Sequence, residues 1–407
     1  MLKFNQQTVN SYLTINRKEN IVMKKIVSTF IAIIMFLFPA LNIPEAEVDK
    51  NIFKTAYTNI FVHGFAGWGE YNALYKAFPY WGAKNGDLMK YLNARGFDCH
   101  AATVSPTTSA WDRACELYAE LTGTVTDYGK AHSESCNHKR FGKDYSKSRL
   151  IEKWSAKDKI NLFGHSFGGA TVRMLAHLMA NGSEEERKAS NDVSELFKGG
   201  KSDWIYSIVT LSAPHNGTSS YDIQESLKTD PNAAKEEQMI AKAFMSIGSL
   251  TAGGRTENDT AIYEMQIDNA LALNKKIETL ENVYYFSYSS DGTKVDENKV
   301  RTPDENYLKS SMYVTTAKRI CSYTGVTPGG YVIDEKWQPN DGLVNTYSAM
   351  APIGAPAKEF DASNITTGIW NVMPVQKGDH TTLQGGMNDS FNGRLFFVDL
   401  LTMINTL

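Results

Sequence analysis

The sequence predicts an α/β fold in which helices cover both faces of a mostly parallel sheet. Short apolar runs that suit buried strands alternate with helix-like stretches, which is the β-α-β rhythm of a doubly wound sheet. A glycine-rich turn at residues 164–168 joins one of these runs to a helix-like stretch. With 407 residues, 42% of them hydrophobic, the chain can fill a core of that size.

The expected strands and helices follow one another in that order. Strands are predicted at residues 59–62, 97–104, 159–163, 204–212 and 282–288. Helices are predicted between them at residues 86–92 and 170–178. Residues 219–275 are also mostly helical in character, so they form a helical insertion between two strands.

The N-terminal segment has a different character. A charged start at residues 23–25 precedes an apolar run at residues 26–40, which is typical of a secretory signal peptide. The run is shorter than the ~20 residues that span a bilayer, so no stable membrane anchor is expected. We therefore expect Met23 to be the true start, residues 1–46 to be an extension with a signal peptide, and residues 47–407 to form one secreted domain.

Charge and cysteine content exclude some classes of protein. Lys plus Arg number 42 against 45 for Asp plus Glu, so the net charge of −3 gives no reason to expect a nucleic-acid partner. Four cysteines are few for an exported protein of this size. Free buried thiols are expected, although one disulfide stays an alternative.

The turn at residues 164–168 reads Gly-His-Ser-Phe-Gly between an apolar run and a helix-like stretch. Strand, G-x-S-x-G and helix together are typical of a nucleophile elbow, which exposes a reactive serine, here Ser166. Backbone N–H groups at the start of the helix can stabilise a developing oxyanion. The alternative is a glycine-rich turn that carries an inert serine.

A second glycine-rich loop, residues 63–69, follows the first predicted strand. In folds with a nucleophile elbow, an N–H from such a loop and the N–H after the nucleophile bind the oxyanion. The backbone amides of Phe65 and Phe167 are therefore the expected donors. The alternative is that the loop only ends a strand.

A reactive serine needs a histidine to take its proton and a carboxylate to orient that histidine. His380 lies in a polar loop near the C-terminus, where the base of this fold belongs, whereas His215 precedes every candidate acid. Asp341 and Asp291 both lie between Ser166 and His380. The residues alone leave the choice between these two acids open.

A methionine-rich apolar face at residues 238–245 lies within the helical insertion. It fits ordinary core packing. It equally fits a movable lid that covers a site in water and opens against a lipid surface. Both interpretations stay open.

The chain resembles the secreted bacterial lipases of the staphylococcal and thermoalkalophilic Bacillus type over roughly residues 58–400. The matching segments lie at residues 63–69, 80–82, 111–116, 127–129, 132, 138–142, 164–168, 213–218 and 340–346. The resemblance implies an α/β-hydrolase fold and a triad of Ser166, Asp341 and His380. It thereby favours Asp341 over Asp291.

The resemblance also implies a zinc site, through Asp112, His132, His138 and Asp268. Taken alone, such residues on a polar loop are more often solvated. Four protein ligands leave no position for a catalytic water, so the expected role is structural. The zinc would hold an insertion at about residues 105–145, and the lid would lie at about residues 219–275.

Calcium binding is left uncertain. Relatives commonly hold calcium through carboxylates just after the catalytic histidine, but residues 381–387 here contain none. Calcium needs several oxygen ligands, among which carboxylates are the strongest.

The expected function is hydrolysis of carboxylic esters, above all triacylglycerol, at an oil–water or membrane interface. A phospholipase or a short-chain carboxylesterase could use the same fold and triad. A lipid-binding protein with an inert elbow is the alternative from outside the enzymes. Acyl-chain preference and oligomeric state have no signature in the sequence.

Overall fold

The computed structural model describes residues 56–407 except 233–234, 236–237, 239–240, 243–253 and 387–390. The expected signal peptide and most of the methionine-rich face lie outside these residues. None of the helices in the described part is long and apolar enough to cross a membrane. All four cysteines are buried and unpaired, which confirms the expected free thiols.

The centre of the fold is a seven-stranded sheet with the order β13-β14-β7-β6-β5-β1-β2. Every neighbouring pair in it is parallel. In chain order the strands are β1 (Thr58–Val62), β2 (Cys99–Ala102), β5 (Ile160–His165), β6 (Ile205–Leu211), β7 (Tyr284–Tyr288), β13 (Ala357–Glu359) and β14 (Trp370–Val372). The five predicted strands are present, and the α/β prediction is confirmed.

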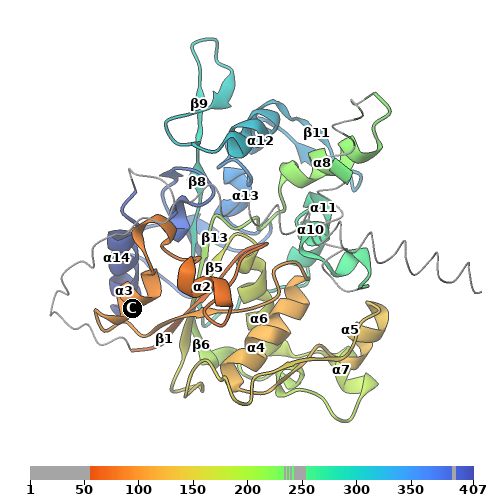
Figure 1. Ribbon diagram of the computed structural model, residues 1–407, viewed down its shortest axis with the longest axis vertical. Helices are drawn as coiled ribbons and strands as arrows, with labels where there is room; N and C mark the ends of the chain where they lie inside the picture. The colour runs from red at the N-terminus through yellow and green to blue at the C-terminus, as the bar shows by residue number, and fades with distance from the viewer. Residues whose placement is uncertain (1–55, 233–234, 236–237, 239–240, 243–253, 387–390) are drawn as a thin grey trace, which may run out of the picture. The chain divides into compact units, whose positions relative to one another are not determined.

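Helices cover both faces of the sheet (Figure 1). One face carries α4 (Ala110–Thr122) and α6 (Gly168–Asn181), and the other carries α3 (Leu88–Asn93) and α14 (Gly393–Asn405). The residues of strand β1 show why both faces are covered. Ile60 and Val62 pack into the first core, on the face of α4 and α6, and Phe61 packs into the second core, on the face of α3 and α14. Alternate side chains of a strand point to opposite faces, so a fully apolar strand serves two cores.

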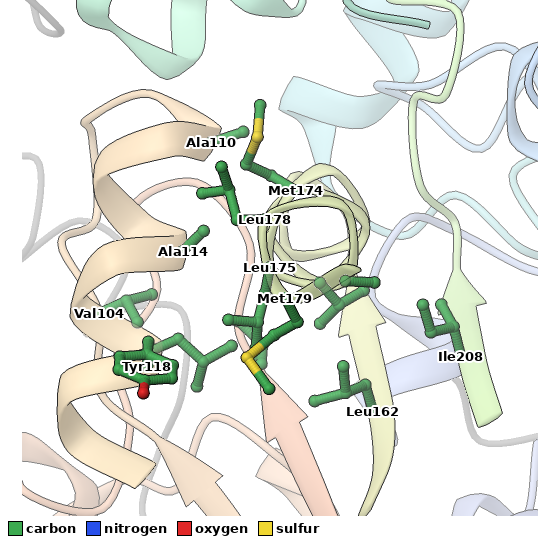
Figure 2. Close-up of a cluster of buried hydrophobic side chains, with 14 of the residues drawn as sticks. Val104, Ala110, Ala114, Tyr118, Leu162, Met174, Leu175, Leu178, Met179 and Ile208 are labelled. Carbon is green, nitrogen blue, oxygen red and sulfur yellow. The ribbon is translucent and has the colours of Figure 1, made fainter. Parts of the chain in front are cut away.

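The first core fills the space between α4, α6 and the sheet (Figure 2). Ala110, Ala114 and Tyr118 recur along α4 and face α6. Small residues at the first two of these positions let the two helices approach closely. Strands β5 and β6 contribute Leu162 and Ile208 from the side of the sheet (Figure 2). Helix α4 is therefore fixed against the helix that begins at the predicted elbow.

The remaining elements are insertions and connections around this centre. Helices there are α2 (Ala73–Ala77), α5 (Lys130–Ser135), α7 (Glu184–Ala189), α8 (Ser219–Thr229), α10 (Ala261–Glu264), α11 (Ile267–Asn274), α12 (Ser311–Ser322) and α13 (Thr346–Met350). Short strand pairs are β3 (Val125–Asp127) with β4 (Phe141–Asp144), β9 (Thr293–Val295) with β10 (Arg301–Pro303), β11 (Gly325–Val326) with β12 (Val332–Ile333), and β8 (Ser290–Asp291) with β15 (Gln376–Lys377). The β3–α5–β4 insertion carries two of the expected metal ligands.

Candidate active site and metal site

Ser166 follows β5 at a sharp turn into α6. Its φ of 54° lies in the left-handed region, which is strained for a residue with a side chain. The turn is held because Ser166 N donates to Leu211 O on the neighbouring strand at 2.9 Å. The strand–turn–helix geometry therefore presents the serine side chain at the carboxyl edge of the sheet.

Close backbone approach explains two glycines around this serine. A Cβ on Gly64 would lie 2.6 Å from Ser166 Cβ. A Cβ on Gly168 would lie 2.3 Å from the carbonyl oxygen of Val62. Both distances are far below van der Waals contact, so the loop after β1 reaches the serine only because both positions lack a side chain.

The structure brings Ser166, His380 and Asp341 together in one chain of hydrogen bonds. His380 Nε2 lies 2.9 Å from Ser166 Oγ, and His380 Nδ1 lies 2.9 Å from Asp341 Oδ2. The other oxygen of Asp341 accepts from Leu343 N at 3.0 Å and from Val344 N at 2.8 Å. The carboxylate is thus held by its own turn, and it favours the imidazole tautomer whose Nε2 can accept the serine proton.

The two alternatives from the sequence lie elsewhere. Asp291 accepts from Thr293 and forms an ion pair with Lys377 at 2.9 Å. His215 lies 2.9 Å from Thr210 Oγ1 and 3.4 Å from Arg173 Nη1. Its pKa falls well below the usual value because of burial and the nearby guanidinium. Neither residue reaches Ser166.

Two side chains that support the site were not singled out from the sequence. His165 Nε2 donates to the carbonyl oxygen of His380 at 2.8 Å, and its Nδ1 accepts from Tyr80 OH at 2.6 Å. The Tyr80 hydroxyl also accepts from Gly64 N at 3.0 Å. Tyr80 therefore connects the loop after β1 with the loop of His380. Its position in the family-like segment at residues 80–82 was the available signal.

The expected oxyanion donors flank the serine with unused amides. Among the described residues, neither Phe65 N nor Phe167 N donates a hydrogen bond to another protein group. Their neighbours do, since Gly64 N donates to Tyr80 OH, Ala66 N to Pro106 O and Ser166 N to Leu211 O. Both amides are therefore free to donate to a group bound beside Ser166.

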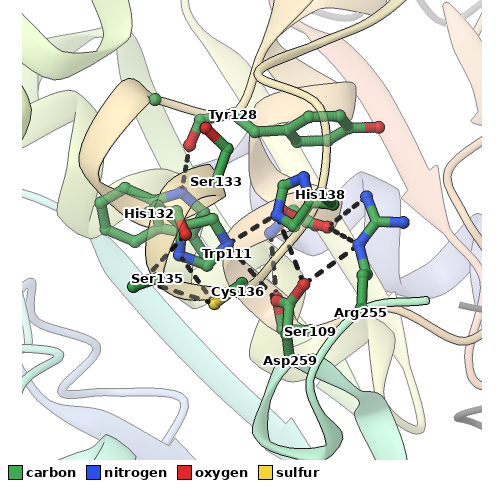
Figure 3. A network of polar contacts seen from close by, with 12 residues as sticks. Ser109, Trp111, Tyr128, His132, Ser133, Ser135, Cys136, His138, Arg255 and Asp259 are labelled. Atoms are coloured by element: carbon green, nitrogen blue, oxygen red, sulfur yellow. Dashed lines mark hydrogen bonds and ion pairs between the residues drawn. The ribbon is translucent and has the colours of Figure 1, made fainter. Parts of the chain in front are cut away.

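A second cluster lies between α4, the β3–α5–β4 insertion and the segment before α10. One ligand atom each from Asp112, His132, His138 and Asp259 lies within 4.8 Å of all the others, so the cluster could hold a metal ion. His132 Nε2 is 3.1 Å from Asp112 Oδ1 and 3.4 Å from Asp259 Oδ1 (Figure 3). His138 Nε2 is 3.5 Å from Asp259 Oδ2.

Several observations fit a cation at this point. His138 Nε2 is a buried atom without a hydrogen-bond partner. Burial disfavours charge on His132, but hydrogen bonds to Asp112 and Asp259 outweigh it and raise the pKa of His132 to about 11. Two buried carboxylates thus attract positive charge. Arg255 Nε lies on their outer side, 2.8 Å from Asp112 Oδ2 and 3.0 Å from Asp259 Oδ2.

The prediction of Asp268 as the fourth ligand is wrong. Asp268 lies on α11, where it accepts from Thr327 Oγ1 at 2.5 Å and from Gly329 N at 2.6 Å. Asp259 takes its place, because the turn at Glu257–Asp259 returns to the first turn of α4 and Ser109 Oγ donates to Asp259 at 2.6 Å. Several acidic residues occur in this stretch, and the sequence offered only the local similarity around Asp268 to choose among them.

A cavity of about 550 Å³ opens beside the metal cluster. Its lining includes Tyr128, His138 and Arg255, so one histidine of the cluster faces it. Within the part of the chain that the structure describes, no other group of three or more His, Cys, Asp or Glu side chains is arranged to hold a metal ion.

Comparisons with known proteins agree with this architecture. A profile of the family described as "Lipase-like, C-terminal domain" matches residues 55–232 and 253–394. A protein named "Lipase" from Staphylococcus hyicus is 30% identical over 399 residues, which cover 89% of this chain and 59% of that protein. "Lipase 2" from Staphylococcus aureus is 30% identical over 81% of this chain and 50% of its own. The chain thus spans about half the length of these relatives.

Solved structures match over nearly the whole chain. EstA from Clostridium botulinum superposes with a TM-score of 0.74 and 29% identity, covering 91% of this chain and 93% of its own. Staphylococcus hyicus lipase gives a TM-score of 0.74 with 28% identity, covering 89% and 99%. Lipase 1 from Pelosinus fermentans gives 0.71 with 31%, covering 87% and 99%. The resemblance drawn from the sequence is confirmed, and the chain belongs to the lipase-like family with an α/β-hydrolase fold.

Proposed function

We propose that this protein is a serine ester hydrolase that cleaves the acyl esters of lipids, with triacylglycerol as its main substrate. The observation that carries the proposal is the hydrogen-bonded chain from Asp341 through His380 to Ser166. The lipase names of its relatives favour acyl lipids among the possible esters. Phospholipids and short soluble esters are the competing substrates.

The reaction follows from the geometry in two halves. Ser166 Oγ attacks the ester carbonyl while its proton passes to His380 Nε2. Asp341 stabilises the imidazolium by accepting from Nδ1. The carbonyl oxygen becomes an oxyanion between Phe65 N and Phe167 N, and each such donor contributes about 3 kcal/mol in comparable sites.

The intermediate then collapses and is hydrolysed. The bond from carbon to the alcohol oxygen breaks, and the alcohol leaves with the proton from His380. An acyl ester on Ser166 remains. His380 next takes a proton from water as the water attacks this ester. The second oxyanion then collapses, the bond from carbon to Ser166 Oγ breaks, and His380 returns the proton to Oγ, which releases the fatty acid and restores Ser166.

We further propose that the metal of the second site is zinc, held by Asp112, His132, His138 and Asp259. Two imidazole nitrogens and two carboxylate oxygens form a donor set that suits tetrahedral zinc. When bound, the ion supplies a cross-link between α4, the β3–α5–β4 insertion and the segment before α10. With four protein ligands its role is structural.

A serine pair tests the proposed reaction. Ser212 is the matched control for Ser166, because it is also buried, follows the next strand and has a φ of 48°, yet its hydroxyl contacts Ser290. Ser166→Ala should abolish cleavage of emulsified trioctanoin and of p-nitrophenyl butyrate, whereas Ser212→Ala should keep both activities. A fluorophosphonate should label wild-type Ser166. Full activity of Ser166→Ala, or labelling at another residue, would overturn the proposal.

The substrate class is tested in the same preparation. Initial rates on trioctanoin emulsion, phosphatidylcholine vesicles and soluble p-nitrophenyl butyrate should rank triglyceride first. A higher rate on phosphatidylcholine would make the protein a phospholipase. Activity confined to the soluble ester would make it a carboxylesterase.

A further inference from the structure

A fully buried arginine lies between the first turn of α4 and the loop that carries Phe65. Arg113 is 0% exposed. Its Nη1 donates to Ser105 O at 2.8 Å and to Gly64 O at 3.4 Å, and its Nη2 donates to His63 O. Its Nε donates to Thr171 Oγ1 on α6 at 2.8 Å.

This guanidinium carries its charge without an ion pair. In the described part of the chain no carboxylate lies within 4.0 Å of it, and its partners are carbonyl and hydroxyl oxygens. Glu116 and Glu264 attract its charge electrostatically but do not pair with it directly, so its direct partners are the backbone carbonyls around the site and one hydroxyl. The position of the charge points to a role at the site.

We propose that Arg113 is a positioning residue that orients the peptide between Gly64 and Phe65, so that Phe65 N–H points to the oxyanion. The inference rests on the proposed ester hydrolysis. A trans peptide is planar and its C=O and N–H point in opposite directions. Holding Gly64 O on the guanidinium side therefore turns Phe65 N–H away from it, and this N–H is one of the two unused amides.

Two other groups also contact Gly64 O, and Arg113 is the charged donor among the three. Gly64 O also lies 2.8 Å from His63 Nδ1 and 3.2 Å from Gly67 N. Burial, and then the charge of Arg113, lower the pKa of His63 to about 3, so its ring is neutral. A neutral imidazole has a single N–H to share between Gly64 O and Val104 O. The guanidinium is the donor with fixed charge and geometry.

Arg113 also reaches the second amide-bearing residue. Its guanidinium carbon lies 5.3 Å from the centre of the Phe167 ring. Thr171 Oγ1, which accepts from Arg113 Nε, donates to Phe167 O at 3.3 Å. One side chain thus fixes the loop after β1 relative to the start of α6. Its positive charge additionally favours the negative charge that develops on the substrate oxygen.

The test compares two buried arginines. Arg173 is the matched control, because it is 4% exposed and contacts His215 and Asn274 instead of the site. The kcat and KM on p-nitrophenyl butyrate are measured per active site, with sites counted by exhaustive fluorophosphonate labelling. Arg113→Met should lower kcat by about 100-fold, the usual effect of losing one oxyanion donor, with little change in KM.

Two further readouts separate positioning from a merely structural role. The affinity for phenylboronic acid, whose tetrahedral adduct fills the oxyanion position, should fall in parallel with kcat in Arg113→Met. Arg113→Lys, which keeps the charge but not the fork, should recover about a tenth of wild-type kcat. Arg173→Met should lower the melting temperature while keeping the kcat and boronate affinity of the wild type.

Thr171→Val covers the case in which Arg113→Met does not fold. It keeps the arginine but removes the acceptor of Nε, and it should lower kcat several-fold with KM unchanged. Wild-type kcat per labelled site in Arg113→Met, or in both Arg113→Lys and Thr171→Val, would overturn the inference. If the wild type itself neither hydrolyses esters nor reacts with the phosphonate, the proposed function fails instead.

Discussion

Replacing Asp259 with asparagine removes one charged ligand from the metal site and leaves the fold around it in place. The carboxylate lies 3.4 Å from His132 Nε2 and 3.5 Å from His138 Nε2. Changing a residue that only supports a ligand typically weakens metal binding by about 10- to 100-fold. Loss of a ligand should therefore weaken zinc binding by at least about 100-fold. Asp268→Asn, which removes bonds to Thr327 and Gly329, should leave zinc affinity unchanged.

The expected change in stability follows from this affinity. In excess zinc, a 100-fold weaker dissociation constant removes about 2.7 kcal/mol of stabilisation. For a domain of this size that lowers the melting temperature by about 4 °C. Asp268→Asn can also lower it, but the fall should be the same with and without EDTA.

Inductively coupled plasma mass spectrometry gives the metal content, chelator competition gives the affinity, and calorimetry with and without EDTA gives the melting temperature. EDTA should destabilise the wild type and Asp268→Asn but not Asp259→Asn. Zinc lost from Asp268→Asn and retained by Asp259→Asn would refute the assignment. A wild type that binds no zinc would refute the metal proposal altogether.

Two further predictions concern other carboxylates. Asp341→Asn should lower kcat on the ester assay by about 10⁴-fold, because an amide that donates to His380 Nδ1 holds the wrong imidazole tautomer. Asp291→Asn loses the ion pair with Lys377, and its kcat on the same assay should stay within a few-fold of the wild-type value. Asp222 on α8 has its pKa raised from 3.8 to about 7 by burial, despite a bond from Ile267 N. The pKa of Asp222 is higher in the folded state than in the unfolded state, so ionisation of this carboxyl destabilises the fold. The free energy of unfolding falls by up to about 1.4 kcal/mol per pH unit between about pH 4 and about pH 7, and this loss is constant above about pH 7. Asp222→Asn should therefore raise the melting temperature at pH 8 and not at pH 4, and an equal gain at both values would contradict this.

The sequence predicted the central strands because their residues are apolar on both faces. Ile60, Phe61 and Val62 are each 0% exposed, and such runs have few other solutions. Strands β13 and β14 were missed. Ala357–Glu359 is three residues long and largely exposed, so it has neither the length nor the apolar pattern of a strand. It is a strand because it pairs with β14 at the edge of the sheet, and its own residues do not indicate this.

Local spacing and long-range geometry contributed differently to the sites. The turn around Ser166 is a local motif, and the structure has the strained φ that the spacing indicated. Asp341 and Asp291 could not be separated from the residues alone, because both follow the serine and precede His380. Which of these two carboxylates lies beside His380 depends on how the insertions between Ser166 and His380 fold. Asp259 could not be identified from the sequence for the same reason, because it reaches α4 only when the segment before α10 folds back against the start of that helix.

Helix α4 shows why the two sites lie on one element. Four of its polar side chains are buried although the helix is part of the core, and three of them meet backbone groups that have no partner in the sheet. Strand β2 ends at Ala102, after which Glu120 accepts from Thr103 N at 2.9 Å and Glu116 accepts from Ser105 N. Buried amides need acceptors, so these acids replace the strand partner that the loop lacks.

Arg113 on the same helix also pairs with backbone groups, but as a hydrogen-bond donor to carbonyl oxygens. It donates to Ser105 O and to the carbonyls of the loop after β1, which also have no strand partner. The residue before it, Asp112, faces the metal cluster. The first turn of α4 therefore holds the oxyanion loop with one side chain and the metal insertion with the next. The buried polar face of α4 is thus explained by the backbone groups and the metal cluster that its side chains contact.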